Sequence, residues 1–139
     1  MRCQPTLELV ERISDGDDTL AIIVRADYAP SETSFITPPE CKQQLGFVVR
    51  AAGTEIPRHR HLPFERRIRG TTECLVVRRG RAELTLYNDR CEAVYRGELN
   101  AGDVVLLVSG GHGFRAIEDT VFLEVKQGPY PGIEEKERF

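Results

Sequence analysis

Apolar and polar side chains alternate along much of the chain, and no stretch shows the 3.6-residue period of an amphipathic helix. Arg81–Tyr87 alternates cleanly, which is typical of a half-buried strand. Val104–Val108 is apolar throughout, as expected for a strand that is buried on both faces. Further strands are predicted at 7–13, 19–25, 45–51, 56–61, 73–77, 91–99, 114–117 and 121–126, with a short edge strand at 34–37. Turn-forming residues separate these segments, so the pattern predicts an all-β sandwich or closed barrel.

The size and charge of the chain narrow its class. With 139 residues the chain is long enough for one domain with a real core, and its net charge of −3 argues against general nucleic-acid binding. Residues 1–5 open no apolar run of the kind found in a signal peptide, and no segment approaches the ~20 apolar residues of a membrane span. We therefore expect a cytoplasmic protein with no membrane and no nucleic-acid partner.

The four cysteines do not suggest a disulfide framework. No two of them form a Cys-x-x-Cys pair, and the chain shows no secretory signal. We expect all four to be reduced thiols, with Cys74 as a small buried thiol in its strand. The cysteines are Cys3, Cys41, Cys74 and Cys91.

The histidines are the main candidates for chemistry. His59 and His61 lie one residue apart in a predicted strand, where alternate side chains point to the same face with Cα atoms about 6.5 Å apart. That separation suits two nitrogen ligands on one metal ion. His112, the third histidine, falls in a predicted glycine-permitted bend at 109–113. Glu73 begins a strand that can lie beside the histidine strand, so three imidazoles and one carboxylate are candidates for a transition-metal site.

These residues resemble the first motif of the cupin family. That motif is a glycine, five residues, His-x-His, a short gap, a glutamate, six residues and a glycine. Gly53 with His59 and His61 matches its first half, and Glu73 with Gly80 matches its second half. The gap between His61 and Glu73 is eleven residues instead of three or four, so this chain carries an insert at 62–72.

The second cupin motif is present in a degraded form. Gly102–Asp103 matches its Gly-Asp turn, Val108–Gly110 replaces Pro-x-Gly, and His112 comes one residue early. The resemblance covers most of residues 45–126. It implies a single domain over 1–139, with N-terminal strands at 7–25 and a C-terminal tail at 127–139.

The resemblance implies a double-stranded β-helix, or jelly-roll, barrel that holds a divalent metal. Fe, Mn, Ni and Zn all suit an imidazole-rich site. Such barrels commonly form homodimers, so a homodimer is expected as well. Carried over from the family, the metal ligands are His59, His61, Glu73 and His112.

Glu65 is an alternative to Glu73 as the carboxylate ligand. Glu65 lies at the ungapped family spacing from His61. Glu73 is favoured because it shares strand parity with Leu75 and Val77 and keeps the six-residue spacing to Gly80.

The insert is rich in arginine. Arg66, Arg67 and Arg69 can reach over the barrel mouth and bind a carboxylate or phosphate, or they can form a solvated loop. Arg58 and Arg60 alternate with the histidines and are expected to face solvent or a subunit interface. Near the C-terminus, Lys126 and Tyr130 are candidates for proton transfer or substrate binding.

Two classes of function follow. The first is a metal-dependent enzyme of dioxygenase or isomerase type that acts on a small anionic or sugar-derived substrate. The second is a non-catalytic module that binds a sugar or small acid.

Overall fold

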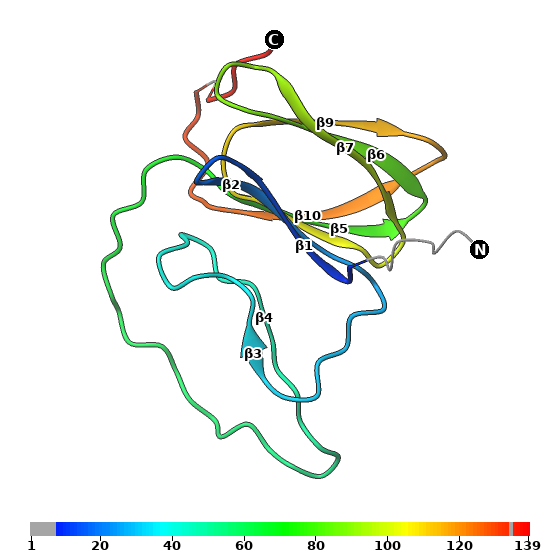
Figure 1. Ribbon diagram of the computed structural model, residues 1–139. Coiled ribbons are helices and arrows are strands. Elements are labelled where there is room, and N and C mark those ends of the chain that lie inside the picture. Colours follow the sequence, from blue (N-terminus) through cyan, green and yellow to red (C-terminus); the bar gives the residue numbers. More distant parts are fainter. Residues whose placement is uncertain (1–7, 134) are drawn as a thin grey trace, which may run out of the picture. The chain divides into compact units, whose positions relative to one another are not determined.

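The computed structural model describes residues 8–133 and 135–139. The chain forms two compact units. The first unit consists of Met1–Tyr28 and Thr72–Phe139, and the second unit of Ala29–Thr71. Every regular element in the described residues is a β-strand (Figure 1). The predicted all-β class is therefore confirmed, and the described residues include no helix that could cross a membrane.

In the residues that the structure describes, ten strands make up three antiparallel sheets. The first unit contains a five-stranded sheet of order β1-β2-β8-β5-β10 and a three-stranded sheet of order β7-β6-β9, and the second unit contains the β3-β4 pair. None of the three sheets closes on itself in the described residues, so the predicted jelly-roll barrel stays a prediction. The strands are β1 (Val10–Asp15), β2 (Asp18–Val24), β3 (Ser34–Phe35), β4 (Gly46–Phe47), β5 (Glu73–Arg79), β6 (Arg81–Tyr87), β7 (Ala93–Asn100), β8 (Val104–Leu107), β9 (Gly111–Ala116) and β10 (Val121–Lys126).

The apolar strand β8 lies inside the five-stranded sheet. It pairs with β2 on one side, where Ile22 lies opposite Leu106, and with β5 on the other, where Leu75 lies opposite Val105. Its side chains are buried from Val105 to Leu107, because both faces of this strand are covered. The run of apolar residues correctly predicted a strand without a polar face.

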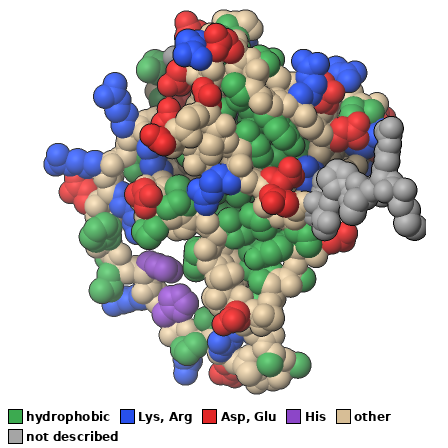
Figure 2. Space-filling model, in the orientation of Figure 1, with side chains coloured by type: hydrophobic (Ala, Val, Ile, Leu, Met, Phe, Trp, Pro, Cys, Tyr) green, Lys and Arg blue, Asp and Glu red, His purple; other side chains and the backbone are tan. Residues whose placement is uncertain are grey.

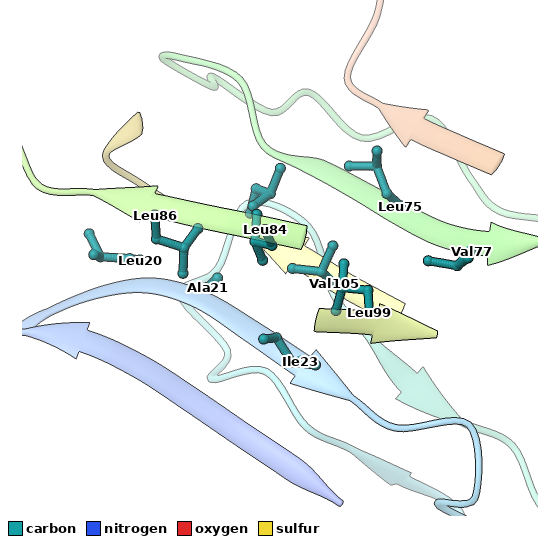
Figure 3. Close-up of a cluster of buried hydrophobic side chains, with 10 residues drawn as sticks. Leu20, Ala21, Ile23, Leu75, Val77, Leu84, Leu86, Leu99 and Val105 are labelled. Atoms are coloured by element: carbon teal, nitrogen blue, oxygen red, sulfur yellow. The ribbon is translucent and has the colours of Figure 1, made fainter. Parts of the chain in front are cut away.

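The core of the first unit is formed by side chains of both its sheets. Figure 3 shows Leu20, Ala21 and Ile23 of β2 beside Leu84 and Leu86 of β6. Each of these side chains is at most 2% exposed. Strands β5, β7 and β8 complete the cluster with Leu75, Val77, Leu99, Val105 and Leu107. Alternate residues of β5 thus bury one face, whereas β2 and β8 are buried on both faces.

A hydrogen-bonded turn ties β8 to the end of β2. Asp103 accepts hydrogen bonds from the backbone N–H of Ala26 at 2.9 Å and of Asn100 at 2.8 Å. It also accepts one from the Arg25 guanidinium at 3.0 Å. Gly102 has a φ of +91°, and a Cβ there would lie 2.7 Å from that of Ala26. Gly102 and Asp103 therefore stabilise this turn, which is a structural role.

The long segment at residues 48–72 contains no strand, and Figure 1 draws it as a loop. The strand predicted at 56–61 is wrong, and the one predicted at 45–51 shrinks to Gly46–Phe47. A strand needs a hydrogen-bonded neighbour, and Pro57 cannot donate to a ladder. The alternation of arginine and histidine at 58–61 has the period of a strand but no apolar face to bury.

The second unit is held by a small polar network. Thr37 Oγ1 donates to Gln44 Oε1 at 2.9 Å and accepts from the backbone N–H of Leu45 at 3.0 Å. The side-chain amide of Gln44 donates to the backbone carbonyl of Cys41 at 2.9 Å. These contacts close the chain between β3 and β4, where the predicted edge strand at 34–37 is confirmed in shortened form.

Cys41, Cys74 and Cys91 are free thiols, as predicted, and Cys3 lies outside the described residues. Burial raises the pKa of the Cys74 thiol. Because the thiolate is the reactive form, we expect iodoacetamide to modify Cys74 more slowly than the exposed Cys91 at about pH 8. The Cys74 rate should keep rising with pH above the ordinary thiol pKa of about 8.5. Peptide mass spectrometry over a pH series measures both rates, and equal rates at every pH would contradict this expectation.

Candidate metal centre

Glu73 and His112 form a close pair in the first unit. The distance from His112 Nε2 to Glu73 Oε2 is 3.3 Å. The Glu73 side chain is only 11% exposed and that of His112 is 34% exposed. The pair thus lies at the boundary between the core and solvent, where two potential metal ligands remain accessible from one side.

Strand register explains why these two side chains meet. His112 lies opposite Leu86 across the β6–β9 ladder, and directly opposed residues project to the same side of a sheet. Leu86 belongs to the core, so His112 faces the space between the two sheets. Glu73 begins β5 and has the parity of the core residues Leu75 and Val77. The prediction that Glu73 faces inward is therefore confirmed.

The predicted location of His112 was wrong in one respect. Residues 111–116 form β9, so His112 lies in a paired strand and not in a glycine bend. Gly110, with a φ of +71°, makes the turn instead. The glycines on either side of His112 permit a bend, but pairing with β6 holds them extended.

Lys126 lies beside Glu73 in the five-stranded sheet. It is the register partner of Glu73 in the β5–β10 ladder, and Glu124 is the partner of Leu75. Both residues therefore face the same side of the sheet as the Glu73 carboxylate. Sequence parity showed that Glu124 and Lys126 share a face, and the register identifies it as the inner face.

Two aromatic rings support His112 and were not predicted as part of the site. The His112 ring contacts Phe114 edge-to-face with centroids 5.9 Å apart, and Phe114 contacts Phe122 at 5.1 Å. Both phenylalanines pack against the core. Their even-numbered positions along β9 and β10 match those of His112 and Lys126, so strand parity would have found them.

A hydrogen-bonded clamp joins the start of β5 to the end of β10. Gln127 Oε1 accepts from the backbone N–H of Thr72 at 2.6 Å, and Gln127 Nε2 donates to Thr72 Oγ1 at 2.7 Å. These bonds lie next to Glu73 and Lys126 in the chain and fix the end of the ladder that presents them. No local pattern of residues predicted this clamp.

His59 and His61 form a second pair, which belongs to the second unit. Their ring centroids are 5.3 Å apart with an interplanar angle of 71°. His59 Nδ1 lies 2.8 Å from the carbonyl oxygen of Pro57. Both residues are exposed, and Figure 2 shows histidine side chains at the surface with Lys and Arg side chains nearby. The two imidazoles are adjacent, as predicted, although the backbone is not a strand.

The donor atoms of both pairs suit a divalent transition metal, because imidazole nitrogen and carboxylate oxygen are its usual ligands. Among residues 8–133 and 135–139, no group of three or more His, Cys, Asp or Glu side chains is arranged to hold a metal ion. The structure brings together Glu73 with His112 and His59 with His61. A site made of all four residues stays a prediction.

The alternative ligand Glu65 has a different environment. Its side chain is 84% exposed and lies 3.8 Å from the Arg67 guanidinium. Glu73 is instead buried and contacts an imidazole, which favours it as the carboxylate ligand.

The predicted anion-binding residues are all exposed. The Arg66 guanidinium lies over the Phe64 ring, 5.1 Å from its centroid, as in a cation–π contact. Arg67 lies near Glu65, and the carbonyl of Arg69 accepts a hydrogen bond from Lys42. Tyr130 is 82% exposed. Their assignment to a substrate stays a prediction.

The described residues of the first unit also form a pocket. It is lined by Asp15, Asp18, Asn88, Asp89 and Arg90 among others, from the β1–β2 and β6–β7 turns. None of the predicted site residues lines it.

Comparisons with known proteins identify no relative: no family model matches the chain, and neither the curated proteins nor the solved structures yield a match.

Proposed function

We propose that this chain is a metal-binding protein of the cupin type whose ligands are His59, His61, Glu73 and His112. The observation that carries the proposal is the 3.3 Å contact between Glu73 and His112 on facing strands of two sheets. The two residues come from the two cupin-like motifs and are 39 positions apart, yet both face the same inner space. A pairing of these two residue types at this boundary supports a site rather than a surface coincidence.

The proposed fold is a jelly-roll barrel. Its support is the arrangement of the first unit, where two antiparallel sheets bury a common core and carry the Glu73–His112 pair at one end. Closure of the barrel requires strand pairing at the outermost strands of these sheets, which are β1, β10, β7 and β9.

The proposed activity is that of a metal-dependent enzyme of dioxygenase or isomerase type. A bound Fe, Mn, Ni or Zn ion would polarise a substrate oxygen or, for a redox metal, activate O₂. Lys126 supports catalysis over simple binding, because it is the register partner of Glu73 and could there hold an anionic substrate or transfer a proton. The substrate class proposed is a small anionic or sugar-derived molecule.

A non-catalytic module that binds a sugar or small acid is the second candidate. The exposed Phe64 ring favours it, because the ring face that Arg66 does not cover can stack on a sugar ring while Arg66 binds an acidic group. Metal-dependent turnover distinguishes the two candidates. A screen of O₂ uptake and isomerisation across small carboxylates and sugars, with and without metal, tests for it.

The metal site is tested by the metal content of the purified protein and by titration with Co²⁺. We expect about one bound Co²⁺ ion per chain. The Co²⁺ affinity should fall on the order of ten-fold or more in His61→Ala, Glu73→Ala and His112→Ala, because each substitution removes a ligand. Glu65→Ala is the matched control, since it removes a carboxylate from the same region of the sequence and should leave binding unchanged.

Stoichiometric Co²⁺ in Glu73→Ala and His112→Ala would overturn the proposed site. Loss of metal in Glu65→Ala with retention in Glu73→Ala would transfer the carboxylate role to Glu65. Circular dichroism of each variant separates ligand loss from unfolding.

A further inference from the structure

The C-terminal tail, 127–139, is attached to both sheets of the first unit. At its start, the side chain of Gln127 is joined to Thr72 by hydrogen bonds of 2.6 and 2.7 Å, next to the first residue of β5. At its other end, the Phe139 ring packs edge-to-face on Tyr87 of β6, with ring centroids 5.1 Å apart. Strands β5 and β6 belong to different sheets, so the tail bridges the two.

The Phe139 ring lies on the outer face of the three-stranded sheet. Tyr87 is the register partner of Gly111 in the β6–β9 ladder. Their neighbours Leu86 and His112 face the space between the sheets, so Tyr87 and Gly111 face outward. A Cβ at Gly111 would lie only 2.8 Å from Phe139 Cζ, which is closer than side chains pack. The ring therefore occupies a place that only a glycine at this position leaves open.

The tail passes the end of the space between the two sheets, where the Glu73–His112 pair lies. Glu73 is the first residue of β5 and His112 the second residue of β9. Figure 1 shows that both strands begin, and β10 ends, at the same end of the first unit, and that the tail runs across this end. Because the tail starts beside β5 and reaches the outer face of the other sheet, it crosses the end of the unit at which the pair meets solvent.

The exposure and the glycines of the tail favour reversible opening. All described tail residues beyond Gln127 are exposed, and Phe139 itself is 67% exposed. Gly132 has a φ of +72°, and in the described chain a Cβ at Gly128 or Gly132 would meet no non-neighbouring heavy atom within 4 Å. Segments that bury little surface open at a low free-energy cost, and glycine leaves the backbone free to change direction. Loss of the Phe139 contact would therefore allow the tail to move while Gln127 stays bound to Thr72.

We infer that the tail is a movable strap over the Glu73–His112 pair and that the Phe139 ring is its latch. While the ring lies on Tyr87 and Gly111, the strap restricts the access of small molecules to the pair. When the ring leaves, the pair becomes open to solvent. The latch does not depend on what the pair binds, whereas the control of metal and substrate entry rests on the proposed function.

Acylation of His112 by diethyl pyrocarbonate in metal-free protein tests the strap. The reagent attacks a neutral imidazole, so its rate reports how accessible the ring is. We expect Phe139→Ala to raise the His112 rate about two- to three-fold, because full exposure of a side chain that is 34% exposed would about triple its accessible area. Peptide mass spectrometry measures the rate for each histidine. His59 and His61 lie in the second unit and are already exposed, so their rates are the internal reference and should not change.

Gly111→Ala is an independent way to open the latch. Its Cβ would collide with the Phe139 ring and displace the ring from Tyr87, while the tail keeps its full sequence. This variant should raise the His112 rate by a similar factor. Tyr87→Phe is the matched control, because it keeps the ring that Phe139 contacts and should leave the rate unchanged. Circular dichroism shows whether each variant is folded, and if Phe139→Ala is not, Gly111→Ala decides the question.

Unchanged His112 rates in the folded Phe139→Ala and Gly111→Ala variants would overturn the strap. An equal rise for His59 and His61 would overturn it as well, because it would indicate a general loosening of the protein instead of the opening of one site. A rise for His112 alone supports the strap.

Co²⁺ exchange relates the strap to the proposed function. The strap supplies no ligand to the proposed site, so its release should speed both the binding and the loss of Co²⁺ and leave the Kd unchanged. Transfer of Co²⁺ from the loaded protein to EDTA should therefore be faster in Phe139→Ala than in the wild type, by a factor similar to that for His112 acylation. Faster acylation of His112 in a protein that binds no Co²⁺ would overturn the metal proposal alone. Co²⁺ binding with unchanged acylation and exchange rates would overturn the strap alone.

Discussion

Asp103→Ala lowers the free energy of unfolding by about 3–5 kcal/mol, as expected when one partner of a buried ion pair is removed. The Asp103 side chain is 5% exposed and accepts three hydrogen bonds, from Arg25, Ala26 and Asn100. The alanine leaves two backbone N–H groups and a largely buried guanidinium without their acceptor. Urea denaturation monitored by circular dichroism measures the change.

The Arg25 guanidinium keeps its positive charge in this network. Burial acts to lower the pKa of Arg25, but its hydrogen bonds to Glu11 and Asp103 outweigh burial and raise that pKa above its ordinary value. The Nη2 atom also lies 2.7 Å from Glu11 Oε2, so part of the charge remains paired in the variant. Asp103→Asn keeps the shape and loses the charge, so it should cost less than Asp103→Ala. An Asp103→Ala protein as stable as the wild type would contradict the role of this turn.

Leu84→Ala is the second change with a large expected effect, a loss of about 2–5 kcal/mol. Leu84 is 0% exposed on β6 and belongs to the core cluster that both sheets bury. Truncation of the side chain removes apolar contacts. It also leaves a cavity, because the two sheets cannot move together far enough to fill the space. The midpoint of thermal unfolding should fall together with the urea midpoint.

Leu9→Ala is the matched control for this prediction. Leu9 is 40% exposed, so the same change of side chain should cost less than 1 kcal/mol, a rough limit for a half-exposed site. Equal losses in the two leucine variants would mean that the space between the sheets is not the main core. The control also removes any general effect of leucine-to-alanine substitution.

The sequence predicted best those strands that bury one face against a partner. The bounds predicted for 81–87 and 121–126 agree with β6 and β10, because alternating apolar residues on these strands meet a neighbouring sheet or strand. At 56–61 the same period carried arginine and histidine, which gain little from burial, and no strand forms. Period alone therefore does not determine a strand when the chain offers no hydrogen-bonded neighbour.

The site was predictable where strand parity applied. The parity of Glu73 with Leu75 and Val77 predicted its inward orientation, and the contact with His112 agrees with it. The strand position of His112 was missed because glycine permits a bend locally, whereas pairing with β6 is a long-range interaction. The predicted participation of His59 and His61 in the same site depends on contacts between residues far apart in the sequence, which no local pattern encodes.

The position of β8 in the five-stranded sheet also bears on how the protein folds during synthesis. The β1–β2 hairpin is made first, but its neighbour β8 emerges only once residue 107 has left the ribosome. A two-stranded hairpin is marginally stable alone. Ile22 and Ile23, which are buried in the folded protein, therefore stay exposed until β8 is available to pack beside them. The pairing of β2 with β8 must close a long loop, so it is slow relative to the formation of local hairpins. A nascent chain that stalls before β8 would therefore expose the apolar side chains of β2 to chaperones.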